Sequence, residues 1–230
     1  DHGTWHLFYL GTPNTSPAPD RVPSFPYLTM KARATSPAGP WTKQKNVVPF
    51  RPTGGTYYSM VASPGYVMTH GGEYLMFFSS TTRKEGNPCV QRTLGIARTK
   101  DLDGAWTPDP APAVPIEEQV ENSSVYFEPV NSTWFLFTNH IGITASGHEY
   151  TDAIWVYWSK DPTRWDAAHK AIVLDPHNCT WSKHIVGLPS VLVVGQRLAI
   201  FYDGTTDPDD LGHMRRDIAL AWLDLPLTPP

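Results

Sequence analysis

Three carboxylates of this sequence lie where acid–base chemistry could be arranged. Glu121 follows an acidic stretch and opens the segment 120–126 (VENSSVY), while Glu149 and Asp152 lie together in 147–152 (GHEYTD). A carboxyl group held among aromatic side chains has a raised pKa and can act as a general acid, with a second carboxylate as its partner. We therefore take Glu121, Glu149 and Asp152 as candidate catalytic residues. The alternative is an ordinary role, as a solvated connector residue for Glu121 and at the start of a strand for Glu149 and Asp152.

A second group of side chains has the polar or aromatic chemistry that holds a ligand. Trp181 breaks the spacing of the other tryptophans, so it could offer a flat surface for a sugar ring. His184 precedes a short apolar strand, and for a lone histidine a structural role is the alternative. The candidate binding residues are Ser63, Asn122, His140, Trp181, His184, Asp203 and Arg216.

Motifs for metal or nucleotide chemistry are absent from the sequence. It contains no HExxH, paired CxxC, acidic calcium loop, GxSxG elbow or glycine-rich phosphate loop. We therefore expect no catalytic metal and no cofactor, with a structural calcium ion left open. Cys89 and Cys179 both fall in predicted loops, so one disulfide and two free thiols are alternative interpretations.

Composition narrows the class of protein. The 230 residues carry a formal charge of −4 without a basic block, which argues against nucleic acid as a partner. We also expect no membrane partner, because no apolar run approaches the length of a membrane span. The chain opens on Asp1 without an initiator Met, so we expect a processed, trimmed or partial product. The sequence leaves the compartment open, with a secreted or periplasmic one favoured.

The elements that must position these residues repeat along the chain about every 60 to 65 residues. Each unit has an aromatic strand followed by a second strand, and a packing tryptophan follows in the first three units, at Trp41, Trp106 and Trp165. A repeat of this length with about four strands predicts a β-propeller blade. The 23 prolines and 17 glycines suit such an all-β fold. We expect one domain over 1–230, with blade-like repeats near 1–50, 51–115, 116–175 and 176–230.

Alternation of side chains and enrichment in β-branched or aromatic residues predict the individual strands. The first sequence repeat begins without an inner strand, and the fourth repeat ends without an outer strand. No segment has the period of an amphipathic helix. The predicted strands are 4–12, 27–35 and 41–49; then 59–69, 73–80, 91–99 and 105–114; then 121–130, 133–140, 152–159 and 164–174; and finally 187–195, 197–204 and 216–223.

Strand direction predicts which connections share one end of the blades. Because successive strands are antiparallel, each inner strand starts at the end where the second strand connects to the third. Glu121 lies at such a start, whereas Glu128 lies toward the opposite end. Long polar loops commonly carry function, so we expect the site at this end. The loops concerned are 12–27, 80–91, 139–151 and 204–215.

The repeating unit and the segments 74–79, 95–107 and 200–204 resemble the five-bladed β-propeller glycoside hydrolases of families 43, 32, 68, 62, 117 and 130. The resemblance covers nearly the whole chain and implies an all-β propeller, five-bladed in the complete protein, with about four blades recognisable here. It also implies three carboxylates at the heads of inner strands. Glu121 matches the acid position. Ser63 stands where an Asp-Pro pair is typical, and the inner strand that would carry the base is not in this chain.

The resemblance also implies an activity. We expect a glycoside hydrolase that acts on an oligosaccharide or polysaccharide by carboxylate acid–base chemistry in the central funnel, with carbohydrate as its partner. The displaced carboxylates suggest an alternative, a carbohydrate-binding propeller without catalysis. A protein-interaction propeller is a third hypothesis, which the polar, histidine-rich loops disfavour.

Overall fold

A computed structural model describes residues 1–230 of the chain except 20, 22, 88 and 208–215. The described elements are β-strands and one 3-10 turn, η1 (Ile116–Glu118), with no α-helix among them. Within these described ranges, no helix is long and apolar enough to cross a membrane. The chain forms two compact units, one of Asp1–Gln91 with Gly95–Pro112 and one of Arg92–Leu94 with Ala113–Pro230. Each unit is described by itself below.

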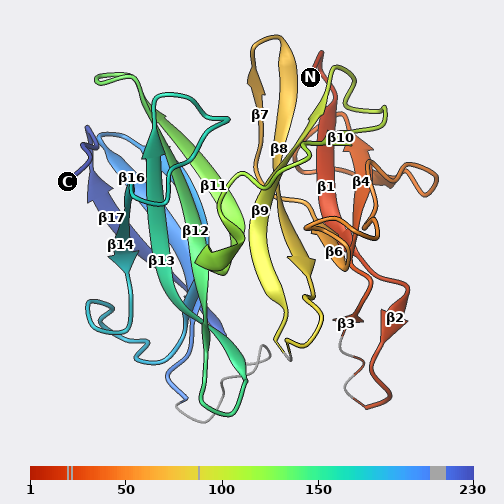
Figure 1. The fold of residues 1–230 in the computed structure, drawn as a ribbon. Helices are drawn as coiled ribbons and strands as arrows, with labels where there is room; N and C mark the ends of the chain where they lie inside the picture. Colours follow the sequence, from red (N-terminus) through yellow and green to blue (C-terminus); the bar gives the residue numbers. More distant parts are fainter. Residues whose placement is uncertain (20, 22, 88, 208–215) are drawn as a thin grey trace. The chain divides into compact units, whose positions relative to one another are not determined.

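The first unit contains two main sheets and a short ribbon (Figure 1). One sheet has the order β1 (Trp5–Gly11), β4 (Leu28–Ala34), β5 (Thr42–Lys43). The other has the order β10 (Thr107–Pro108), β9 (Gln91–Thr99), β8 (Glu73–Thr82), β6 (Val61–Ser63), and β7 (Val67–His70) also pairs with β8. The ribbon joins β2 (Asn14–Thr15) to β3 (Pro23–Ser24). Residues 92–94 of β9 are grouped with the second unit.

The second unit also contains two sheets. The first has the order β11 (Val120–Glu128), β12 (Thr133–Ile143), β13 (Glu149–Ser159), β14 (Lys170–Leu174), and all its neighbouring strands are antiparallel. The second has the order β15 (Val186–Val194), β16 (Arg197–Gly204), β17 (Asp217–Asp224), again antiparallel. A four-stranded antiparallel sheet in chain order is the arrangement that the sequence predicts for one blade.

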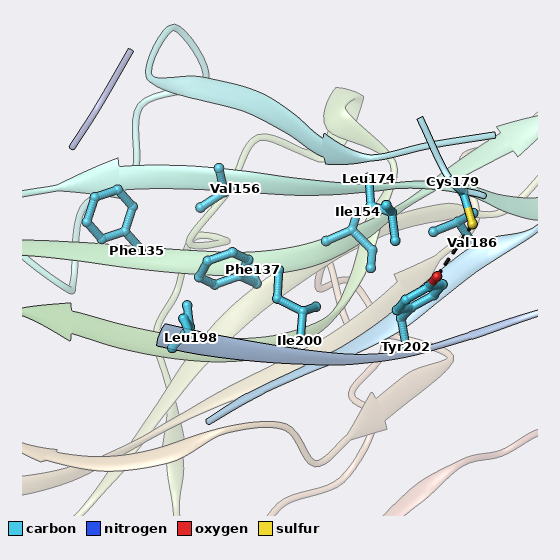
Figure 2. Packing of buried hydrophobic residues seen from close by; sticks show 10 residues of the cluster. All are labelled: Phe135, Phe137, Ile154, Val156, Leu174, Cys179, Val186, Leu198, Ile200 and Tyr202. Atoms are coloured by element: carbon cyan, nitrogen blue, oxygen red, sulfur yellow. Dashed lines mark hydrogen bonds between the residues drawn. The ribbon is translucent and has the colours of Figure 1, made fainter. Parts of the chain in front are cut away.

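Alternate residues of these strands build the core of the second unit (Figure 2). Phe135 and Phe137 of β12 lie beside Ile154 of β13 and Ile200 of β16, all at most 3% exposed. Successive side chains of a strand point to opposite faces, so alternate residues enter this cluster, as Leu198, Ile200 and Tyr202 of β16 do. In the described structure Cys179 is buried and Cys89 is half-buried, and both are free thiols.

A second core lies in the first unit, around Phe78 of β8 and Trp106. The ring of Phe50 contacts that of Phe78 with centroids 4.8 Å apart. Trp106 is 4% exposed, and Trp165 of the other unit is 7% exposed. The repeating tryptophans at these two positions are therefore packing residues, as predicted.

Most predicted strands are confirmed to within two or three residues, and the exceptions have local causes. The predicted strand 105–114 is reduced to β10, because prolines at 108, 110 and 112 remove backbone N–H donors. The predicted strand 59–69 divides around Pro64 into β6 and β7. The predicted strands 41–49 and 164–174 are shorter, as β5 and β14. The predicted loop 139–151 is wrong in extent, because β12 continues to Ile143 and β13 already begins at Glu149. Most of the predicted loop 204–215 lies outside the described residues.

Candidate active site

Two of the candidate carboxylates share one arginine in the second unit. Arg92 Nη1 donates to Glu121 Oε2 at 2.6 Å, and Arg92 Nη2 and Nε donate to Glu149 Oε2 at 2.6 and 3.2 Å. The three side chains are 19 to 22% exposed, so solvent and small ligands can reach them. Glu121 and Glu149, 28 residues apart in sequence, therefore belong to one ionic cluster.

A β-bulge at the head of β11 positions Glu121. Glu121 pairs with Asn139 of β12, and the register then shifts between Glu121 and Ser124. Asn122 adopts a left-handed conformation with φ 57°, and its side chain donates to Asn139 Oδ1 at 2.8 Å. The Thr138 hydroxyl fixes the Glu121 carbonyl at 2.7 Å. Bulges re-aim side chains near functional sites, and here the bulge orients Glu121 toward Arg92.

Arg92 is a charged anchor that the sequence analysis missed. Burial alone would lower the pKa of its guanidinium, but the attraction of Glu121 and the bonds to Glu149 outweigh burial and raise that pKa. The guanidinium is therefore permanently charged between the two carboxylates. Its position as the second residue of the predicted strand 91–99 was the available signal, because that strand begins at the loop end expected to hold the site.

A second group of candidates lines one cavity of about 490 Å³. His140 Nδ1 lies 2.6 Å from Asp152 Oδ1, and the imidazole stacks on Trp155 with centroids 4.2 Å apart and planes at 8°. His184 lines the same cavity from the segment before β15. Lys170 Nζ lies 4.3 Å from the centroid of the Trp155 ring. Glu121 and Glu149 do not line this cavity, so the predicted residues form two groups.

Asp203 and Arg216 form a buried pair. Arg216 Nη1 donates to Asp203 Oδ2 at 2.9 Å and to the Thr151 hydroxyl at 3.0 Å. Their side chains are 11 and 8% exposed. Asp203 Oδ1 and the Nε and Nη2 of Arg216 are buried without a hydrogen-bond partner among the described residues. This pair links β13 and β16 to the residue that precedes β17, and it leaves polar atoms unpaired.

The remaining candidates have other surroundings. Trp181 donates through Nε1 to the Tyr202 hydroxyl at 2.8 Å and packs against the core of the second unit. Ser63 ends β6 in the first unit. Glu128 is 2% exposed and fully hydrogen-bonded, which agrees with a structural role. Among the described residues, no group of three or more His, Cys, Asp or Glu side chains could hold a metal ion.

Comparison with known proteins gives a fold. No family model matches the chain, and no curated protein does. Solved structures match well: one titled a glycoside hydrolase has 17% identity and a TM-score of 0.65, covering 96% of this chain and 70% of its own. The Bombyx mori GH32 beta-fructofuranosidase has 13% identity and a TM-score of 0.67, covering 97% of this chain. The endo-arabinase of Bacteroides thetaiotaomicron has 13% identity and a TM-score of 0.66, covering 96% of this chain and 71% of its own.

The chain has the β-propeller fold of family 43 and family 32 glycoside hydrolases. It spans 44% of the length of the fructofuranosidase and about two thirds to 71% of several other matched hydrolases. The resemblance inferred from the repeating strands is therefore confirmed for the fold. At sequence identities this low, the structural match shows the fold alone. Any chemical activity has to be argued from the residues of this chain.

Proposed function

We propose that this protein is a glycoside hydrolase that acts on an oligosaccharide or polysaccharide, with Glu121 and Glu149 as its carboxylate pair. The observation that carries the proposal is the convergence of these two glutamates on Arg92 at the head of β11. Hydrolysis of a glycosidic bond commonly uses two carboxyl groups, one to protonate the leaving oxygen and one as base or nucleophile. The chain supplies such a pair in a partly exposed position.

The hydrogen bonds around Arg92 support a division of roles between the two glutamates. Glu149 Oε2 accepts from both Nε and Nη2, whereas Glu121 accepts from Nη1 alone. We assign Glu149 as the base or nucleophile and Glu121 as the proton donor. A bound sugar that replaces the contact between Glu121 and Arg92 would leave Arg92 fixed by Glu149.

A carbohydrate-binding propeller without catalysis is the second candidate function. Ser63 favours it, because the hydrolases that the sequence resembles have a carboxylate at that position. The contact between Glu121 and Arg92 favours it too, because an ion-paired carboxylate has no proton to donate. Both functions require carbohydrate binding and differ only in turnover.

Reducing-sugar release from arabinan, xylan, sucrose and other neutral and acidic glycans tests the proposal. We expect Glu121→Gln and Glu149→Gln each to lower kcat by about 10² to 10⁴, the usual effect of removing one acid–base group. Glu117→Gln is the matched control, because Glu117 is exposed on the neighbouring turn and should retain full activity. Full turnover in Glu121→Gln would refute its assignment. Glycan binding by the wild-type protein without release of any sugar would support the binding function instead.

A further inference from the structure

We propose that the cavity lined by His140, Asp152, His177, Lys183 and His184 binds an acidic sugar, a unit that carries a carboxylate or a phosphate or sulfate ester. We call it the histidine cavity. It lies within the second unit and has a volume of about 490 Å³. Small-molecule sites usually have volumes of about 300 to 1,000 Å³. The choice of a sugar as ligand rests on the proposed function, whereas the preference for negative charge rests on the cavity itself.

Each of the two carboxylates of the cavity has a hydrogen-bond contact through one oxygen. Asp152 Oδ1 lies 2.6 Å from His140 Nδ1. Asp175 Oδ1 accepts from the backbone N–H groups of His177 and Asn178 at 2.9 and 3.0 Å. These bonds hold the two carboxylates in place and leave their charge unchanged. The preference for an anion therefore depends on the basic side chains that line the cavity, His140, His177, Lys183 and His184, which outnumber the two carboxylates.

The basic groups of the cavity are available by contrast. His177 and His184 are exposed, and neither imidazole ring has a hydrogen bond in the part of the chain that the structure describes. Lys183 Nζ donates to the carbonyl oxygens of Cys179 and Pro176, which hold the ammonium in place without neutralising it. Three groups that carry or can gain positive charge thus meet at one cavity.

Other side chains that line the cavity can recognise the neutral part of a sugar. Because Asp152 holds Nδ1 of His140, the other ring nitrogen, Nε2, is left for a ligand. Tyr150 adds a phenol at the same wall. Trp155 has His140 stacked on it and the ammonium of Lys170 above its ring, so it is a poor platform for a sugar ring. Recognition in this cavity therefore depends on charge and hydrogen bonds more than on stacking.

Calorimetric titration of the whole chain at pH 6 and low salt tests this proposal. The ligands are D-glucuronate, glucose 6-phosphate and glucose 6-sulfate, with glucose as the neutral sugar and inorganic phosphate as the bare anion. We expect at least one acidic sugar to bind about tenfold or more tightly than both glucose and phosphate. Comparison of the three acidic sugars identifies the anionic group.

Variants and pH locate the binding. His177→Gln/His184→Gln should weaken it about tenfold, and neither ring has contacts whose loss would disturb the fold. His2→Gln removes an exposed histidine of the other unit and should bind as wild type does. Binding should weaken from pH 6 to pH 8, because histidine side chains as a class lose their positive charge in this range.

Three results would overturn the proposal: glucose binding as tightly as every acidic sugar, inorganic phosphate doing so, or the double variant binding as wild type does. Absence of any binding would overturn it as well. The proposed hydrolase is tested separately, since binding is measured without turnover.

Discussion

At the scale of single residues, two glutamates of one strand have opposite surroundings. Glu121 at the head of β11 is partly exposed and meets a charged arginine. Glu128 at the end of β11 is 2% exposed and accepts bonds from the Tyr126 hydroxyl and from the backbone N–H groups of Val130 and Leu227, at 2.9 to 3.1 Å. The first arrangement leaves room for a ligand, and the second ties β11 to the chain after β17. Both residues are glutamates, so the difference between the candidate catalytic role of Glu121 and the structural role of Glu128 comes from the groups that surround each side chain.

Glu128 should make the stability of the protein depend on acid pH. Burial alone would raise the pKa of Glu128, but the bonds from Val130, Leu227 and Tyr126 outweigh it and leave the pKa below its ordinary value of 4.5. A lowered folded-state pKa contributes stability above pH 4.5 that is lost as the pH falls through the folded-state value. We expect Glu128→Gln to lower the free energy of unfolding by about 2 kcal/mol at pH 7 in urea titrations.

The same loss should shrink toward zero below the folded-state pKa, where wild-type Glu128 is itself protonated. Glu85→Gln is the control, because Glu85 is exposed and should follow the wild-type pH profile. An equal loss for Glu128→Gln at pH 7 and in strong acid would show that the carboxylate charge has no part in the effect.

The sequence predicted where Glu121 lies in the fold, but not which side chain it pairs with. Chain position was enough to place Glu121 at the head of an inner strand, since only strand order and direction were needed. The link through Arg92 could not be predicted, because it depends on the register of β9, β11 and β13 and on a bulge at Asn122. The break in tryptophan spacing at Trp181 was real, but its side chain packs on the core of the second unit and donates to Tyr202.

At the scale of elements, the alternation of hydrophobic side chains predicted most strands. It did not predict strand ends that depend on backbone hydrogen bonding. β8, β12 and β16 match their predictions closely, because each carries a long run of apolar or aromatic residues. The short outer strand β10 could not be predicted from side-chain pattern, since proline acts through its missing N–H. A β-bulge or an early strand end also depends on backbone hydrogen bonding, so the side-chain pattern does not reveal it.

Gly95 shows how closely packed the elements of the first unit are. A Cβ atom at Gly95 in β9 would lie 2.5 Å from Phe78 and closer still to the Tyr57 hydroxyl. Tyr57 is fixed by its bond to the Asp109 carbonyl at 3.1 Å, and Phe78 is fixed by Phe50. We expect Gly95→Ala to lower the free energy of unfolding by about 3 kcal/mol, because rigid rings cannot move aside.

Urea denaturation followed by tryptophan fluorescence measures this loss. Gly104→Ala is the matched control, because its added methyl group would meet its nearest atoms, those of Asp101, at 3.4 Å. We expect the control to change stability by about 0.5 kcal/mol or less. Similar stabilities for the two variants would contradict the close packing of β9 on Phe78.

At the scale of the whole molecule, the chain has two compact units and the sequence predicts a single domain. Each unit has its own buried cluster, around Phe78 in the first and Phe137 in the second. Strand β9 contributes to both, because residues 92–94 group with the second unit while Gln91 and residues 95–99 group with the first. Thr93 and Leu94 are hydrogen-bonded to Val114 and Ala113 of the second unit.

A strand shared in this way should couple the unfolding of the two units. We expect Gly95→Ala, placed in the first unit, to lower the free energy of hydrogen exchange for slowly exchanging amides of β12 and β16 by about the same 3 kcal/mol as for those of β8. The reason is that unfolding of β9 removes the partners of Val114 and Ala113 while it opens the first unit. Mass spectrometry of deuterated peptides measures both units in one sample. Loss of protection confined to residues 1–91 and 95–112 would instead establish two independently folding domains.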